Sequence, residues 1–129
     1  KYIIHTSTIE KYIDRIGYEN NGADILILGN VGDFTAQGMQ KGKMTIHGKA
    51  ESHLGYFFQN GIIKVNQTRC FLGCQMSGGK ISVEKACGMI GHGMQGGEIH
   101  IEKEYASFGD DIRGIIFYKG EKIHSYKKR

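Results

Sequence analysis

The stretch GCQMSGGKISVE, residues 73–84, returns eighteen residues later as GHGMQGGEIHIE, residues 91–102. Aligning the rest of the chain on this phrase produces two columns of glycines at the same spacing: Gly55, Gly73, Gly91 and Gly109 in the first, and Gly61, Gly79 and Gly97 in the second. Glycine at a fixed position in every repeat indicates a bend that needs a positive φ angle or a close backbone approach. We therefore assign these seven glycines a structural role at the corners of a repeat.

Two apolar columns, separated by one polar position, follow the glycines. The first holds Ile63, Ile81, Ile99 and Phe117, the second holds Val65, Val83 and Ile101, and Lys64, Ser82 and His100 lie between them. This alternation predicts a strand with one buried face. With a nineteen-residue step the phrase extends backwards through Met44 and Ile46, and then through Ile25 and Ile27.

A coil of this length cannot bury its apolar face alone and must stack on its neighbours, at about 4.8 Å per coil. The repeat therefore predicts an all-β fold, a parallel β-helix or solenoid of about five to six coils, with residues 22–118 as its body. Residues 1–21 are expected to form a strand at residues 2–5 and a short capping helix, and residues 119–129 a basic tail. Residues 115–118 and 121–123 are expected to close the far end.

The helix prediction rests on the segment STIEKYIDRIG, residues 7–17. Ser7 and Glu10 match a capping box, and Gly17 matches a C-terminal stop signal. The apolar residues Ile9, Tyr12, Ile13 and Ile16 recur at the spacing of one helix face. These signals together predict an amphipathic helix of about nine residues lying over the first coil.

Composition limits the classes of function that this chain suits. Its 129 residues, 40% of them hydrophobic, are enough for one domain with its own core. The net charge of +4 equals that of residues 119–129 alone, so the body of the repeat is neutral. This balance argues against a nucleic-acid-binding face, and no long apolar run predicts a membrane segment. The odd count of three cysteines argues against a disulfide framework and favours the cytoplasm.

The repeat phrase resembles that of a known family. It is carried by GKAESHLGYFFQNGIIKV, NQTRCFLGCQMSGGKISV and EKACGMIGHGMQGGEIHI, residues 48–101. This phrase is similar to the repeat of the GXGXG domain family. Its members include one subunit of formylmethanofuran dehydrogenase, which we call the glycine-repeat subunit, and the C-terminal domain of the glutamate synthase large chain. A hexapeptide acyltransferase solenoid is excluded, because a six-residue register from Leu72 runs to Gly78 and Glu84 instead of small aliphatic residues.

The resemblance implies a right-handed β-helix that acts as a structural member of a large oxidoreductase. In such complexes the metal, pterin, flavin or iron–sulfur chemistry lies elsewhere, so the expected partners are other subunits of an oxidoreductase complex, with self-association as a further option. We expect no catalytic activity and no cofactor in this chain. A separate chain of repeats favours the formylmethanofuran dehydrogenase type, and a stand-alone glutamate synthase-type domain is the alternative.

One column invites a chemical interpretation of another class. Directly after the first glycine column come Tyr56, Cys74, His92 and Asp110. Stacking would place Cys74, His92 and Asp110 side by side, as a cysteine nucleophile, a base and an orienting carboxylate. Alternatively, Cys70, Cys74, Cys87 and His92 would supply ligands to a metal. A third interpretation is a column that varies without a function, and this is the one we favour.

Two other sets of residues are assigned to packing. Met39, Met76 and Met94 recur in one column and predict a core ladder in preference to a soft-metal site. His53 shares a column with Phe71 and Met89, which predicts partial burial instead of metal ligation.

Overall fold

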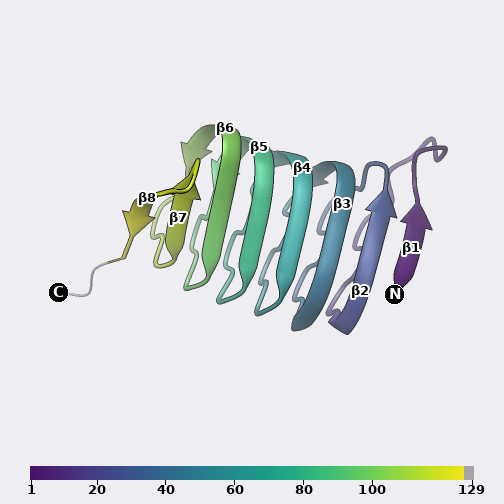
Figure 1. The fold of residues 1–129 in the computed structure, drawn as a ribbon, viewed down its shortest axis with the longest axis horizontal. Coiled ribbons are helices and arrows are strands. Elements are labelled where there is room, and N and C mark those ends of the chain that lie inside the picture. Colours follow the sequence, from purple (N-terminus) through teal and green to yellow (C-terminus); the bar gives the residue numbers. More distant parts are fainter. Residues whose placement is uncertain (127–129) are drawn as a thin grey trace.

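The computed structural model describes residues 1–126 and arranges eight strands in one sheet, in the order of the sequence (Figure 1). The strands are β1 (Tyr2–His5), β2 (Asn21–Leu28), β3 (Lys41–Ser52), β4 (Ile62–Cys70), β5 (Lys80–Ile90), β6 (Glu98–Phe108), β7 (Ile115–Tyr118) and β8 (Glu121–Ser125). Strands β1 to β7 pair in parallel, and β8 pairs antiparallel with β7. Parallel neighbours require a connection that returns to the start of the sheet, and here each return completes one coil of a β-solenoid of about five turns.

The register of the strands confirms the predicted ladders. Ile63 pairs with Ile81 and Ile81 with Ile99, while Val65 pairs with Val83 and Val83 with Ile101. Towards the N-terminus, Met44 continues the first ladder, one coil before Ile63. All of these side chains are buried, because the alternation along each strand turns them towards the inside of the coil.

The last coil corrects one assignment. The repeat period places Phe117 in the buried isoleucine column, but Ile99 pairs with Ile116, which is fully buried. Phe117 instead pairs with His100, and their rings stack with centroids 4.3 Å apart. The reason is a shortened return: Ile115 N–H donates to the Gly97 carbonyl, which makes this step one residue shorter than the eighteen-residue repeat.

Apolar ladders fill the inside of the solenoid, and the methionine ladder is among them. Met39, Met76 and Met94 are fully buried, and Phe58 occupies the same column between the first two. The prediction that these methionines belong to the core is confirmed. Because each coil contributes only a few such side chains, burial depends on contact with the coils on both sides.

The predicted N-terminal helix is wrong, since residues 1–126 contain no helix. Residues 6–20 instead complete a first coil that pairs with the next one. Arg15 N–H donates to the Asp33 carbonyl, Glu19 N–H donates to the Gln37 carbonyl, and the Ile16 carbonyl accepts from Ala36, each at 2.8 Å. A helix of about nine residues is marginal in isolation, and stacking satisfies the same backbone groups against a preformed neighbour.

The corner of each coil explains why this segment stacks. Residues with left-handed φ angles occur in threes at alternate positions: Arg15, Gly17 and Glu19; Phe34, Ala36 and Gly38; His53, Gly55 and Phe57; Phe71, Gly73 and Gln75. The first two sets have φ angles of 58°, 75° and 52°, and of 57°, 61° and 66°. Gly17 is therefore a member of the first glycine column and not a helix stop. Left-handed backbone costs a non-glycine residue about 1–2 kcal/mol, so the stacking of neighbouring coils must offset it.

The predicted structural glycines fall into two geometric classes. Six of them have φ angles between 66° and 112°. Gly109 does not have a positive φ angle, but a Cβ atom there would collide with the backbone and Cβ of His92. Close approach of two coils is thus the constraint at Gly109, whereas left-handed backbone is the constraint at the other six.

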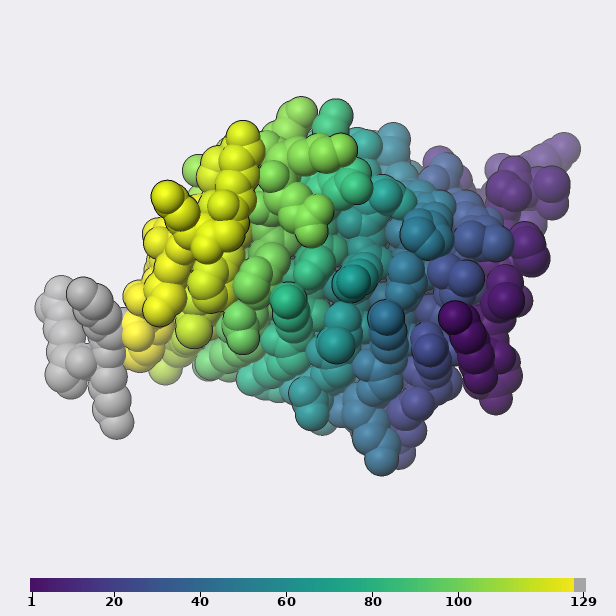
Figure 2. Space-filling view, viewed as in Figure 1, coloured from purple at the N-terminus to yellow at the C-terminus, as the bar shows by residue number. Residues whose placement is uncertain are grey.

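The C-terminal end of the sheet is covered by β8, seen in yellow at one end of the space-filling view (Figure 2). The His124 Nε2 lies 2.8 Å from the Ile112 carbonyl, and the Tyr118 hydroxyl donates to the Lys103 carbonyl at 3.0 Å. Residues 121–125 of the predicted tail therefore belong to the sheet. Residues 127–129, the last part of that tail, lie outside the described residues.

Gly73→Ala and Gly91→Ala separate backbone strain from steric overlap. Both glycines lie in the same column with φ angles of 66° and 72°. A Cβ at Gly73 would lie 2.8 Å from Ile99 Cδ1, whereas at Gly91 its nearest neighbour lies at 3.5 Å. We expect Gly91→Ala to lower the free energy of unfolding by about 1–2 kcal/mol and Gly73→Ala by about 2–4 kcal/mol. Chemical denaturation measures both, and equal losses would contradict the overlap at Gly73.

Candidate functional site

The column of Cys74, His92 and Asp110 forms a ladder across three consecutive coils. Its members are joined through the backbone: Phe57 N–H donates to the Cys74 carbonyl, Gln75 N–H to the His92 carbonyl, and Gly93 N–H to the Asp110 carbonyl, at 2.9–3.1 Å. The three residues predicted to lie side by side are therefore brought together, one coil apart. The same column extends to Tyr18 and Gln37 in the first two coils.

Cys74 has the environment of a packing residue. Its side chain is only 4% exposed. Burial raises the pKa of the Cys74 thiol above its ordinary value, and a hydrogen bond to the His92 backbone opposes that rise only in part. A nucleophilic cysteine needs a stabilised thiolate, so this environment opposes the role that the hydrolase interpretation requires.

His92 and Asp110 are not arranged as a base and its orienting carboxylate. Both residues are exposed. The Asp110 backbone N–H donates to His92 Nδ1 at 3.1 Å, so the main chain and not the carboxylate of Asp110 positions this ring. A triad depends on a carboxylate that holds the imidazole tautomer and stabilises its charge. The ladder therefore places cysteine, histidine and aspartate on neighbouring coils, but without the carboxylate-to-imidazole hydrogen bond that a catalytic triad uses.

The candidate metal ligands do not form a coordination cluster. Cys70 is half-buried, Cys74 is buried and Cys87 is exposed, and all three thiols are free. The Cys87 sulfur accepts a hydrogen bond from Gln67 Nε2 at 3.7 Å. Within residues 1–126, no group of three or more histidine, cysteine, aspartate or glutamate side chains is arranged to hold a metal ion.

An aromatic column lies beside this ladder and includes His53, which is half-buried as predicted. The His53 ring stacks between Phe34 and Phe71, with centroids 4.8 Å from each, and Arg15 lies 5.5 Å from the Phe34 ring centre. His53 Nδ1 is buried without a hydrogen-bond partner among the described residues. Four coils thus share one continuous stack, which stabilises left-handed residues that are not glycine.

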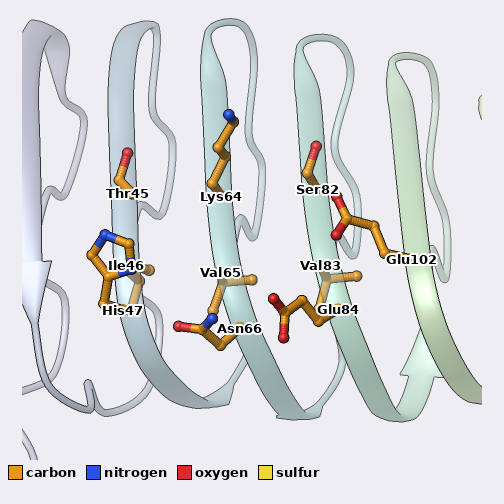
Figure 3. A pocket seen from close by; sticks show the side chains of 10 residues that line it. All are labelled: Thr45, Ile46, His47, Lys64, Val65, Asn66, Ser82, Val83, Glu84 and Glu102. Atoms are coloured by element: carbon orange, nitrogen blue, oxygen red, sulfur yellow. The ribbon is translucent and has the colours of Figure 1, made fainter.

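A shallow polar groove of about 170 Å³ crosses the outer face of β3 to β6. Figure 3 shows Thr45, Lys64 and Ser82 in one row along neighbouring strands, with Asn66 and Glu84 in the next. Glu84 also lies 3.4 Å from Lys103, and the two side chains are 37% and 59% exposed. Exposed ion pairs of this kind contribute little to stability, and the row is a charged, solvated sheet face.

A larger groove, of about 500 Å³, lies at the corner that follows the first glycine column. It is lined by Tyr18, Glu19, Gln37, Gly38, Phe57, Gln59, Gln75, Ser77 and Gln95, all from the connections between strands. This groove was not predicted from the sequence, although Gln59, Ser77 and Gln95 recur at the eighteen-residue period. That recurrence was the available signal, and it did not stand out because those positions lie outside the predicted strands.

Thiol reactivity tests the packing role of Cys74. We expect exposed Cys87 to react first with a thiol-specific reagent, and Cys74 to react at an appreciable rate only after unfolding, because its thiol is buried and its pKa is raised. Alkylation followed by peptide mass spectrometry identifies the order. Modification of Cys74 in the folded protein before Cys87 would overturn the packing role.

The raised pKa of Cys74 also predicts a pH dependence of stability. The unfolded chain loses this proton at a lower pH than the folded chain, so the free energy of unfolding falls as the pH rises above about 8.5. Cys74→Ala removes this contribution, and we expect a shallower decline between about pH 8 and pH 10 in chemical denaturation. Cys87→Ala, at an exposed thiol, is the matched control and keeps the steeper decline. If the free energy of unfolding declines with pH equally steeply in wild type and Cys74→Ala, the prediction is refuted.

The described residues contain no helix long and apolar enough to cross a membrane. Comparisons of this chain with protein-family models, with curated proteins and with solved structures found no match.

Proposed function

We propose that this chain is a non-catalytic structural module that docks onto another subunit of an oxidoreductase complex. The observation that carries this proposal is a concentration of exposed apolar side chains on the first coil. Six of the large hydrophobic residues that are exposed lie within residues 1–18: Tyr2, Ile3, Ile9, Tyr12, Ile13 and Tyr18, at 63%, 57%, 42%, 50%, 41% and 55%. Exposed apolar residues gathered on one element are typical of interaction surfaces.

The pairing within the first coil supports the same surface. Tyr2 stands in register with buried Ile25, and Ile4 with Ile27, so the inward columns of the solenoid run on into β1. Tyr2 remains largely exposed at the end of its column, whereas Ile25 is covered by coils on both sides. A partner seated on this coil would bury side chains of a type that the solenoid buries elsewhere.

The state of the Cys74, His92 and Asp110 ladder supports a role without catalysis. Its cysteine is buried with a raised pKa, and its histidine is positioned by a backbone amide. A buried thiol and a histidine held by the main chain suit a column that packs neighbouring coils together. In this proposal the redox groups are carried by the partner subunits and not by this column.

The repeat phrase supports the finer assignment. We propose a right-handed β-helix of the GXGXG type, a cytoplasmic location, and a role like that of the glycine-repeat subunit of formylmethanofuran dehydrogenase. Left-handed residues at three alternate positions in each of the first four corners suit a glycine-rich repeat phrase of that kind. A stand-alone domain of the glutamate synthase type is the alternative assignment.

Copurification from the native host tests this proposal. We expect the tagged full chain to retain subunits that carry pterin, iron–sulfur or flavin groups, identified by mass spectrometry. Ile3→Lys and Ile13→Lys should lower their recovery by about tenfold or more, since a buried lysine at an interface is costly. Ile123→Lys changes a residue of similar exposure on β8 and should leave recovery unchanged.

Three outcomes separate the alternatives. Recovery of glutamine amidotransferase and FMN-containing domains would favour the glutamate synthase type. Recovery that is insensitive to both first-coil variants would contradict docking through this surface. Stoichiometric metal in the purified chain, measured by elemental analysis, would contradict a module without redox groups of its own.

A further inference from the structure

The corner groove has the chemistry of a binding site, and it shares one residue, Tyr18, with the six residues of the first-coil surface that carries the assembly role. It exists because Gly38, with a φ angle of 66°, leaves a gap between Glu19 and Phe57 in one left-handed column. A second hollow of about 420 Å³, lined by Arg15, Tyr18 and Gln37, adjoins it and shares two of its residues. The combined space is in the range of small-molecule and short-oligomer sites.

Amide side chains dominate the walls of this groove. Gln59 and Gln95 are exposed and Gln75 is half-buried, while Gln37 holds its Oε1 atom buried without a hydrogen-bond partner among the described residues. An unpaired buried carbonyl oxygen is costly, and if the Gln37 side chain turns this shielded atom towards the groove, a ligand that donates a hydrogen bond removes that cost. Each amide both donates and accepts, which matches hydroxyl groups that do the same.

Two exposed aromatic rings flank the amides. Phe57 is 49% exposed and Tyr18 is 55% exposed, and both line the groove. Their faces provide apolar platforms next to the polar groups, an arrangement that suits a ligand with hydroxyl edges and C–H faces. Sugar rings have this amphipathic shape.

Charge and backbone pairing argue against other polymers. Of the described residues that line the larger groove, Glu19 is the only charged one, and the adjoining hollow adds Arg15. One cation beside one carboxylate gives the combined space no cationic wall for a phosphate-rich or acidic ligand. The backbone is also occupied: Ser77 N–H donates to the Phe58 carbonyl at 2.8 Å, and Gln95 N–H donates to the Met76 carbonyl at 2.7 Å. These pairings leave an extended peptide little free strand edge to join at this corner.

We propose that this corner groove binds a neutral oligosaccharide, with amide side chains bonding to its hydroxyls and Phe57 and Tyr18 stacking on its rings. The wild-type chain is titrated with neutral oligosaccharides of glucose, xylose, mannose and N-acetylglucosamine, and with oligogalacturonate as a charged probe. NMR spectra of the glutamine side-chain amides report where binding occurs. We expect at least one neutral probe to shift Gln59, Gln75 and Gln95, with no shift from oligogalacturonate.

Two groove variants and one control complete the experiment. Gln59→Ala and Phe57→Ala each remove a group from an exposed position, and we expect each to weaken binding about tenfold. Asn66→Ala removes an amide from the sheet face of Figure 3 and should leave binding unchanged. Thermal unfolding shows whether each variant is folded. If Phe57→Ala does not fold, the binding affinity of Gln59→Ala alone decides the test. The proposal is overturned if no neutral probe shifts these amides at millimolar concentration, if both groove variants bind like wild type, or if an unstructured peptide binds here more tightly than every saccharide.

Discussion

Backbone hydrogen bonds from each coil to the next are the constraint that organises this molecule. At the first glycine column, Gly73 N–H donates to the Leu54 carbonyl, Gly91 N–H to the Leu72 carbonyl, and Gly109 N–H to the Ile90 carbonyl. This ladder favours a similar corner in successive coils, and the first five corners use left-handed backbone at alternate positions. A slip of one residue would turn the buried columns outward, so the apolar pattern and the corner enforce the same register.

Stacking turns each position of the repeat into a column, and the columns decide what the side chains can do. Cys74 and His92 are equivalent in the repeat, yet Cys74 is buried and His92 is exposed. The column brings them together without giving them the bonding of a catalytic pair. At the same corner, stacking also aligns glutamines and aromatic rings into a groove, because a glycine interrupts the column of larger side chains. The position of a residue in the repeat thus decides which side chains lie next to it on neighbouring coils. The surrounding residues decide whether that side chain is buried and what it bonds to.

The body of the fold and the contents of its main ladders could be predicted, since a half-buried strand repeated at a fixed period leaves a clear pattern. The pairing of Ile63, Ile81 and Ile99 follows directly from that period. The N-terminal segment was harder to predict. Its apolar spacing fits a helix face, but residues 15–19 reproduce the corner of the following coil. Phe117 was misplaced for a related reason, because the last return is one residue short and moves Ile116 into the core. The glutamine groove was missed because its residues lie on connections, where no strand pattern marks them.

Periodic apolar and glycine columns have few physical solutions, so the residue pattern alone was enough to specify a stack of repeated coils with glycines at the corners. Which segments join the stack, and which side chains find partners, became fixed only in the folded chain. The first coil folds by pairing with a neighbour that local sequence does not describe. The burial of Cys74, the backbone contact of His92 and the unpaired oxygen of Gln37 likewise depend on atoms one coil away. Those properties arise from contacts between coils, and contacts of that kind are set by packing and not by the residue types alone.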